Sequence, residues 1–304
     1  MARSVAAFRP KAALRQGELR ELITGLAAVS PESQPEPSLP PAGSGGPTVT
    51  MAQLDAGLVG ALGFRDEAAS FQQAAAAVGL RPPGRFGTEV VARLLGLRTN
   101  HPAGQDDLER LPGDPAPRAE AAYSVAQILR LSDWQKQQVE DAATSFDLPQ
   151  LTQWQRRVLT TAVGFIGFPY VWGGESERPQ SPFGLQAAGG FDCSGFAWRV
   201  FKLQSYPGAP QLAGVLRGRT AAAMAGEVPR ASRIKRDRLA PADLVFFGPG
   251  GRRARPAQID HMALYLGNGW LIHSSRYGVA LVPVEGWYDT RLAWGRRPLA
   301  EAGL

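Results

Sequence analysis

Apolar residues recur at helical spacing through the first half of the chain. Segments with this period carry their apolar side chains on one face, which is typical of amphipathic helices that pack on a core. Five such segments lie at residues 14–27, 50–63, 117–131, 133–146 and 151–168. The pattern therefore predicts a mostly α-helical N-terminal region.

Three of these predicted helices resemble one another. Each has an acidic or amide residue near its start, at Glu18, Gln53 and Glu120, and apolar residues at helical spacing follow. The copies are spaced unevenly, by 35 and 67 residues. Their likeness predicts an internal repeat in the first half of the chain.

Beyond residue 168 the pattern changes to short apolar runs separated by glycine and turn residues. Such runs predict successive antiparallel strands, here at residues 244–247, 261–267, 270–275 and 279–284. Residues 194–202 have helical character. The two halves together predict an α+β fold, in which a helix packed on an antiparallel sheet follows a mostly helical region.

Proline- and glycine-rich breaks indicate how the chain is divided. Residues 30–48 are rich in Pro, Ser and Gly and predict a linker, and a second break covers residues 102–117. A chain of 304 residues is long enough for two domains. We therefore predict a helical domain over residues 1–150 and a second domain over residues 151–304.

The net charge of +6 is distributed unevenly along the chain. Residues 1–150 carry 14 Lys/Arg and 17 Asp/Glu, whereas residues 151–304 carry 19 and 10, so the halves are −3 and +9. Two basic clusters dominate the second half: Arg230, Arg233, Lys235, Arg236 and Arg238, and Arg252, Arg253 and Arg255. They are either solvated loops or a surface that attracts a polyanion. No aromatic residues interleave them and no nucleic-acid motif is present, so nucleic acid is not an expected partner.

No apolar run is long enough to cross a bilayer, so no membrane span is expected. Residues 1–17 lack the apolar core and small-residue cleavage site of a secretory signal. Export is therefore not visible in the sequence as it stands.

The sole cysteine, Cys193, excludes an internal disulfide framework and leaves one thiol to explain. It directly precedes the helical segment 194–202, so it is expected at a helix N-terminus. There the unpaired amides and the helix dipole favour thiolate over thiol, and the amide of Cys193 is suited to hold an oxyanion. Gly195 is expected to let a substrate backbone approach the sulfur.

A thiolate nucleophile needs a base, and the chain has three histidines. His101 lies in a turn sequence far from the cysteine and is expected to be an exposed loop residue. His261 and His273 lie on two strands of a predicted hairpin. This chemistry needs no cofactor, and the remaining residues offer no metal-ligand set with recognisable spacing.

The register of this hairpin decides whether the two histidines can act together. A two-residue loop would place His261 and His273 on opposite faces of the sheet. A three-residue loop, which pairs Leu266 with Trp270, would place them on one face as diagonal neighbours. A triad requires the second arrangement, with His261 as the base for the cysteine and His273 orienting its ring.

These residues form a recognisable signature. Tyr-Val-Trp-Gly-Gly at residues 170–174 is followed by Asp-Cys-Ser-Gly at residues 192–195, by His261 at the start of a strand, and by His273 on the next strand. The order resembles the NlpC-type cell-wall peptidases, a papain-like family of cysteine peptidases, over about residues 151–300. The resemblance implies that Cys193, His261 and His273 form the catalytic triad.

The resemblance also implies a substrate: stem peptides of bacterial peptidoglycan, cut most commonly between D-γ-glutamate and the diamino acid. It further implies that Tyr170 contacts the substrate near the oxyanion, and that Asp192 and Ser194 bind the free amine of the stem peptide. The residues alone allow other roles, which are core packing for Trp172 and capping of the cysteine helix by Asp192. The implied location is secreted or associated with the cell wall.

Two stretches depart from the compact family pattern. Residues 175–190 are inserted before the cysteine motif, and residues 248–259 lengthen the approach to His261. Both are expected to border the cleft, so they bear on substrate choice rather than on the catalytic residues.

The repeats of the first half resemble S-layer homology modules over residues 8–131. Phe8-Arg9-Pro10 precedes the first copy, and residues 117–120 (Pro-Arg-Ala-Glu) match the Thr-Arg-Ala-Glu element of these modules. The middle copy, at residues 50–53, lacks both the arginine and the acid. Such modules would tether the protein to anionic wall polymers, and a plain helical domain is the alternative.

Two other functions are open at this point. An amidase or acyltransferase uses the same triad chemistry with a different cleft. A non-catalytic wall-binding protein with a vestigial peptidase domain is the second, although the complete set of Cys193, His261 and His273 argues against it.

Overall fold

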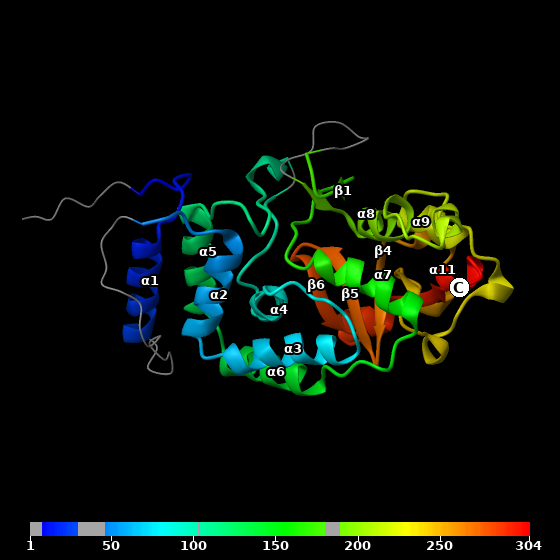
Figure 1. Ribbon diagram of the computed structural model, residues 1–304, viewed down its shortest axis with the longest axis horizontal. Helices are drawn as coiled ribbons and strands as arrows, with labels where there is room; N and C mark the ends of the chain where they lie inside the picture. Colours follow the sequence, from blue (N-terminus) through cyan, green and yellow to red (C-terminus); the bar gives the residue numbers. More distant parts are fainter. Residues whose placement is uncertain (1–7, 30–45, 103, 180–188) are drawn as a thin grey trace, which may run out of the picture.

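The computed structural model describes residues 8–29, 46–102, 104–179 and 189–304. Helices from the first half of the chain occupy one end of an elongated molecule, and a sheet with its own helices occupies the other end (Figure 1). The predicted α+β class is confirmed. Most of the predicted linker, residues 30–45, lies outside the described residues.

All five helices expected from the apolar period are present, each within a few residues of its predicted bounds. They are α1 (Gln16–Val29), α2 (Met51–Ala61), α5 (Arg118–Ile128), α6 (Asp133–Ser145) and α7 (Gln153–Gly164). Capping boxes begin α2, α6 and α7, where Thr50, Ser132 and Thr152 each accept from the amide three residues on. Two more helices, α3 (Arg65–Ala77) and α4 (Phe86–Leu94), were not predicted.

The three predicted repeats meet at their N-terminal ends in a closed ring of backbone hydrogen bonds. The amide of Leu14 donates to the carbonyl of Ala116 (2.8 Å), Ala116 donates to Val49 (2.8 Å), and Val49 donates back to Leu14 (2.9 Å). Each of these residues lies four positions before the residue on which the copies were aligned. The three segments therefore hold equivalent positions around one ring.

The C-terminal part is built on a five-stranded antiparallel sheet with strand order β6-β5-β4-β3-β7. Its strands are β3 (Leu244–Phe247), β4 (His261–Gly267), β5 (Trp270–Ser275), β6 (Gly278–Pro283) and β7 (Leu292–Arg296). The first four agree with the predicted runs to within one residue, whereas the edge strand β7 was not predicted. A separate short ladder joins β1 (Glu175–Ser176) to β2 (Gly190–Phe191).

Four short helices complete the C-terminal part. They are α8 (Cys193–Trp198), which continues as a π-helix over Arg199–Leu203, α9 (Ala221–Gly226), α10 (Gly286–Arg291) and α11 (Pro298–Glu301). No helix within the described ranges of the chain combines the length and the apolar character that crossing a membrane requires.

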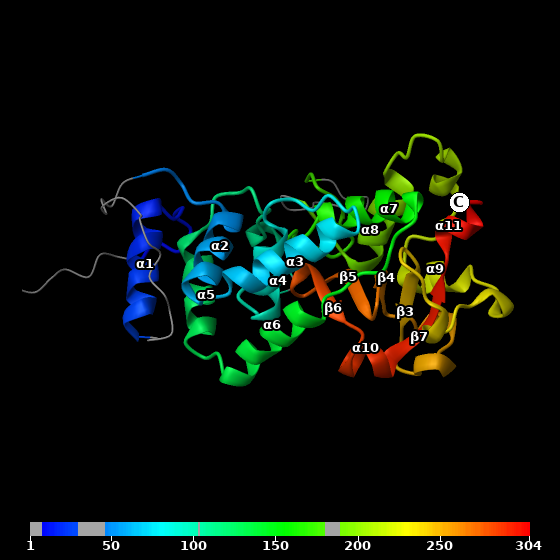
Figure 2. The ribbon, with the colours of Figure 1, turned by 60° about the horizontal axis from the view of Figure 1, so that its bottom comes forward.

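The sheet separates a large hydrophobic core from a small one. Met262 and Leu264 of β4 enter the large core on the side that α7 and α8 cover. Ala263 faces the small core on the opposite side, where α10 lies (Figure 2). Because side chains alternate along a strand, His261 points to the same side as Ala263.

The helical region and the sheet share the large core, which runs without a break across residue 150. Phe71 of α3, Phe146 and Trp270 of β5 form an aromatic cluster with ring centroids 5.0 to 6.1 Å apart. Arg93 of α4 donates to the carbonyl of Gly167, also across this boundary (2.8 Å). The predicted division at residue 150 therefore does not coincide with a gap between two cores.

The β4–β5 hairpin places both histidines on one face of the sheet. Leu264 pairs with Ile272, and this register makes His261 and His273 diagonal neighbours. The hydrogen bond between their rings, 2.7 Å long, agrees with that placement. The arrangement that a triad requires is therefore present.

The loop that produces this register is not the three-residue loop that was expected. Asn268 and Gly269 form a two-residue turn with φ of 45° and 83°, and Gly267 pairs with Trp270. A register shift follows at Leu266, where a bulge adds one residue to β4. The short turn and the bulge together act on the strands as a three-residue loop would.

We predict that Gly87→Ala destabilises the protein, although alanine normally favours a helix over glycine. A Cβ at Gly87 would lie 1.8 Å from the backbone oxygen of Ala68, so α3 and α4 would have to separate. We expect the free energy of unfolding to fall by about 1–3 kcal/mol. Denaturant unfolding measures this, with Gly84→Ala as the matched control because nothing lies within 4 Å of a Cβ there. Equal stability of the two variants would contradict the prediction.

Candidate active site

Cys193 is the first residue of α8, and Asp192 caps that helix. Oδ1 of Asp192 accepts from the amide of Gly195 (2.5 Å) and from the hydroxyl of Ser194 (3.0 Å), while Oδ2 accepts from the amide of Gly173 (3.0 Å). The capping role that the sequence left open for Asp192 is thus present. The amine-binding role that the resemblance implies for Asp192 and Ser194 stays a prediction.

The thiol environment differs from the one expected at a helix start. Burial, and then the nearby carboxylate of Asp192, raise the pKa of Cys193 to about 12. Hydrogen bonds from the amides of Met262 and Ser194 oppose this rise without cancelling it. The expectation that the helix N-terminus would favour the thiolate was therefore wrong, because the capping carboxylate and the loss of water outweigh the amides.

Those amides show where the sulfur lies. Met262 is the residue directly after His261 on β4, so the hydrogen bond from its amide places Sγ of Cys193 beside the start of that strand. The structure thereby brings the nucleophile predicted at a helix start to the strand that carries the predicted base.

The two predicted triad histidines are in direct contact. Nε2 of His261 lies 2.7 Å from Nδ1 of His273, and the ring planes are nearly perpendicular, at 83°. His273 is fully buried and His261 is partly buried. Because Nε2 of His261 is engaged with His273, Nδ1 is the nitrogen available to the cysteine.

Burial keeps both imidazoles neutral. It lowers the pKa of His261 to about 4, an effect to which Arg291 adds and which Asp260 opposes. Burial and the neighbouring His261 lower the pKa of His273 as well. At neutral pH the thiol of Cys193 and the imidazole of His261 therefore both rest uncharged.

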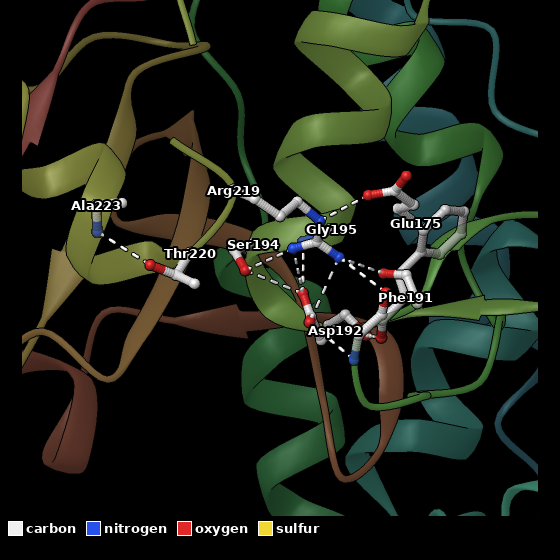
Figure 3. A network of polar contacts seen from close by, with 11 residues as sticks. Glu175, Phe191, Asp192, Ser194, Gly195, Arg219, Thr220 and Ala223 are labelled. Atoms are coloured by element: carbon white, nitrogen blue, oxygen red, sulfur yellow. Dashed lines mark hydrogen bonds and ion pairs between the residues drawn. The ribbon is translucent and has the colours of Figure 1, made fainter. Parts of the chain in front are cut away.

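Arg219 joins its own loop to residues 173–175 and to residues 192–194 (Figure 3). Its Nε donates to Glu175 (2.6 Å), Nη1 donates to Asp192 and Ser194 (3.1 and 2.9 Å), and Nη2 donates to the carbonyls of residues 173 and 174 (both 3.1 Å). This arginine was not identified from the sequence. No motif marks it, and only the fold brings it to the cysteine.

Gly195 allows close packing against the protein's own backbone, and the space beside it is not open to a substrate. A Cβ there would lie 1.9 Å from the carbonyl oxygen of Gly174 and 2.5 Å from the guanidinium of Arg219. The side chain is absent because the Gly-Gly segment and Arg219 pack directly against the first turn of α8. The expected approach of a substrate at this position was therefore wrong.

The aromatic residues before the cysteine motif have unequal surroundings. Tyr170 is partly buried, and burial followed by the groups of Cys193 and Asp192 raises its pKa, which places its hydroxyl in the neighbourhood of the thiol. Its predicted contact with a substrate oxyanion stays a prediction. Trp172 is 78% exposed, so the core-packing role expected for it was wrong.

Helix α10 contributes residues that the sequence did not reveal. The ring centroid of Trp287 lies 5.8 Å from that of His261, and Trp287 is 48% exposed. The hydroxyl of Tyr288 lies 3.2 Å from Nε2 of His273. Arg291 pairs with Asp260, the residue before His261. The segment Gly286–Arg291 thus covers the histidine pair from the side opposite α8.

The inserted segment is fastened to the site by its described ends. Glu175 pairs with Arg219 (2.6 Å), and Glu177 pairs with Arg199 of the helix that α8 begins (2.8 Å). Residues 180–188 of the predicted cleft-bordering stretch lie outside the described residues.

His101 was expected to be an exposed loop residue, but its ring lies between two carboxylates. Its Nδ1 lies 3.1 Å from Glu109 and its Nε2 lies 3.1 Å from Glu120. These two carboxylates raise the pKa of His101 to about 9. Within the described part of the chain, no group of three or more His, Cys, Asp or Glu residues is arranged to hold a metal ion.

Residues 167–297 match the model of the NlpC/P60 family. This part of the chain is therefore an NlpC/P60 domain, over a narrower span than the predicted residues 151–300. The comparisons give no support to the S-layer homology modules predicted at residues 8–131.

Curated relatives match the same half of the chain. A γ-D-glutamyl-L-lysine dipeptidyl-peptidase of Bacillus subtilis is 32% identical over 148 residues, which are 47% of this chain and 41% of the relative. The murein DD-endopeptidase MepH of Escherichia coli is 37% identical over 113 residues, which are 37% of this chain and 33% of the relative. The chain thus spans less than half the length of either relative. Among solved structures, an NlpC/P60 family protein of Bacillus cereus is 26% identical, covers 50% of this chain and 42% of that chain, and superposes with a TM-score of 0.36.

We predict that alkylation of Cys193 by iodoacetamide accelerates about tenfold per pH unit from pH 6 to pH 9, because only the thiolate reacts and its pKa lies near 12. The sole cysteine makes mass-spectrometric labelling specific to this site. N-acetylcysteine, with an ordinary thiol pKa of about 8.5, serves as the reference. A rate independent of pH between 5 and 8 would show a thiolate–imidazolium pair and contradict the neutral pair.

We predict that Arg219→Met lowers the free energy of unfolding by about 3 kcal/mol, because it leaves the carboxylates of Glu175 and Asp192 without their cation. Arg217→Met is the matched control, since Arg217 is an exposed residue of the same loop. Denaturant unfolding of both variants is the measurement. A loss below 1 kcal/mol for Arg219→Met would contradict a stabilising role for the contacts of Arg219.

Proposed function

We propose that the protein is a cysteine endopeptidase that hydrolyses cell-wall stem peptides, with Cys193 as nucleophile, His261 as base and His273 orienting the base. The observation that carries this proposal is the contact of 2.7 Å between the two histidines, on the strand pair beside which the sole thiol lies. All three residues fall within the span that matches the NlpC/P60 family.

The neutral pair defines the first half of the reaction. Nδ1 of His261 takes the proton of the Cys193 thiol as Sγ forms a bond to the carbonyl carbon and the carbonyl π pair moves to oxygen. Nε2–H of His261 donates to His273 and so stabilises the imidazolium that forms. When the oxyanion collapses, the C–N bond breaks, and the imidazolium gives its proton to the leaving amine nitrogen.

The second half removes the acyl group from sulfur. His261, neutral again, takes a proton from a water molecule while the water oxygen attacks the thioester carbon. Collapse of this second oxyanion breaks the C–S bond, and the imidazolium returns its proton to Sγ. Carboxylic acid, amine and the starting thiol are the products, with the amide of Cys193 and the hydroxyl of Tyr170 proposed as donors to the oxyanion.

For the bond that is cut, we propose the one between D-γ-glutamate and the diamino acid, with Asp192 and Ser194 near the free amine of the stem peptide. The dipeptidyl-peptidase activity for which the Bacillus subtilis relative is named supports this choice. The Escherichia coli relative, a DD-endopeptidase, supports the D,D cross-link as the second candidate. Amide or acyl transfer with the same triad, and wall binding without catalysis, are the alternatives.

The proposed substrate implies a secreted or wall-associated protein. The net charge of +9 on residues 151–304 supports attraction to anionic wall polymers as well as to stem peptides.

The test is mass spectrometry of purified peptidoglycan stem peptides with a free N-terminus, as monomers and as cross-linked dimers, incubated with the protein and with Cys193→Ala. We expect the parent to release the dipeptide L-Ala-γ-D-Glu from stem peptides, and Cys193→Ala to lose at least about 10³-fold in rate. His261→Ala should lose a similar amount, because the thiol then lacks its base.

The products discriminate among the candidates. If the protein instead releases monomeric stem peptides from cross-linked dimers, the bond that it cuts is the D,D cross-link and not the γ-D-glutamyl bond. Intact peptides with both parent and variant would rule out the endopeptidase proposal, and assays on amide and ester substrates would follow.

A further inference from the structure

The hydroxyl of Tyr288 reaches the histidine pair from outside the sheet. Its oxygen lies 3.2 Å from Nε2 of His273, whose Nδ1 lies 2.7 Å from Nε2 of His261. Tyr288 belongs to α10, so a helix joins the two strands that carry the histidines. Hydrogen bonds therefore link the three side chains in one line.

An imidazole as third member of a triad has a weakness that a carboxylate or an amide lacks. A neutral imidazole carries its proton on only one nitrogen, so His273 accepts from His261 only when its own proton is on Nε2. With the proton on Nδ1, His273 would donate to Nε2 of His261. His261 would then carry its proton on Nδ1 and would have no lone pair for the thiol of Cys193.

We infer that Tyr288 is a positioning residue that holds His273 in its Nε2–H tautomer by accepting that proton on its hydroxyl oxygen. Nδ1 of His273 is then left to accept from His261, and Nδ1 of His261 is left free for the cysteine. The inference rests on the proposed function, in which His261 is the base.

A tyrosine hydroxyl can donate as well as accept, and the proposed role of His261 as base requires the hydroxyl of Tyr288 to accept here. Burial strengthens this contact. His273 is fully buried, so an Nε2–H group without an acceptor would be costly there. The ring of Tyr288 stands edge-on to that of His273, with centroids 5.2 Å apart and planes at 89°. Phe247 packs against the same tyrosine ring at 5.6 Å, which fixes where the hydroxyl points.

The inference also explains why α10 closes on the sheet at this point. Burial raises the pKa of Tyr288, so its hydroxyl stays neutral and accepts without adding a charge beside the histidines. Trp287, the preceding residue, packs on His261 at the same time. One turn of helix therefore contacts both histidines, one through a ring and the other through a hydroxyl.

Histidine tautomers provide a direct test, because the chain has three histidines. Long-range ¹H–¹⁵N correlation spectra of protein labelled with ¹⁵N-histidine distinguish Nδ1–H from Nε2–H rings, and His101→Asn and His273→Asn assign the signals. In the parent we expect both His261 and His273 in the Nε2–H form. In Tyr288→Phe, which keeps the ring, we expect the Nδ1–H form of His273 to appear. Tyr277→Phe is the matched control, since the hydroxyl of Tyr277 accepts from Arg276 instead.

Two results would overturn the inference. One is an Nδ1–H form of His273 in the parent, and the other is an unchanged tautomer in Tyr288→Phe. Neither depends on the substrate, so a parent protein that leaves muropeptides intact would sink the proposed function while the spectra still decide the role of Tyr288.

Kinetics separate a positioning role from a structural one. In the parent background we expect Tyr288→Phe to lower kcat by about 10- to 100-fold and to change KM by less than about twofold. In a His273→Asn background, the side-chain amide can turn its oxygen to His261 without help, so Tyr288→Phe should then cost less than about threefold. Equal losses in both backgrounds, or a lower unfolding midpoint that accounts for the loss, would contradict the inference.

Discussion

The carboxylate of Asp192 joins the segments that hold the start of the cysteine helix. It caps α8 through the amide of Gly195, holds the Gly-Gly segment through the amide of Gly173, and pairs with Arg219. Arg219 in turn fastens the inserted segment through Glu175. Three stretches, residues 173–175, residues 192–195 and the loop that carries Arg219, therefore meet around this carboxylate, and Cys193 follows it directly in the chain.

This arrangement has an electrostatic consequence. A helix N-terminus attracts negative charge, and here a capping carboxylate already occupies that position. A thiolate at the next residue would be a second negative charge in a site with little water, so the resting thiol stays protonated. The same lack of water keeps His261 neutral. Charge would then develop only when the proton moves from the thiol to His261. The oxyanion and the imidazolium would arise together, and their opposite charges would stabilise each other.

The sequence predicted the features that depend on residues close to one another in the chain. Cys193 at a helix start, four of the five strands of the main sheet and five of the helices follow from apolar period and turn residues. The helix α3 was missed because its alanine-rich sequence has a weak apolar stripe, whereas α4 was missed although its apolar residues lie on one face. The strand β7 was missed because it is short and lies among charged residues.

What could not be predicted depends on tertiary contacts. Arg219 and Tyr288 carry no local signal, because their partners are brought to them by the sheet and by α10. Trp172 looked like a core residue by composition, yet the turn at Gly173 points it outward. The hairpin illustrates the same limit: its register was expected, but two loop geometries produce it, and only the bulge at Leu266 distinguishes them.

The ring of three repeats shows how the N-terminal region bears on the site. The ring leaves α4, which lies between the second and third copies in sequence, free to pack against β6. Arg93 of α4 is buried, pairs with Glu89, and donates to the carbonyl of Gly167, the residue that leads into the Tyr170 segment. Because a buried arginine is stable only while its partners stay in place, the helical region and the catalytic segment are bound to one geometry. The N-terminal region is therefore part of the scaffold on which the site is built.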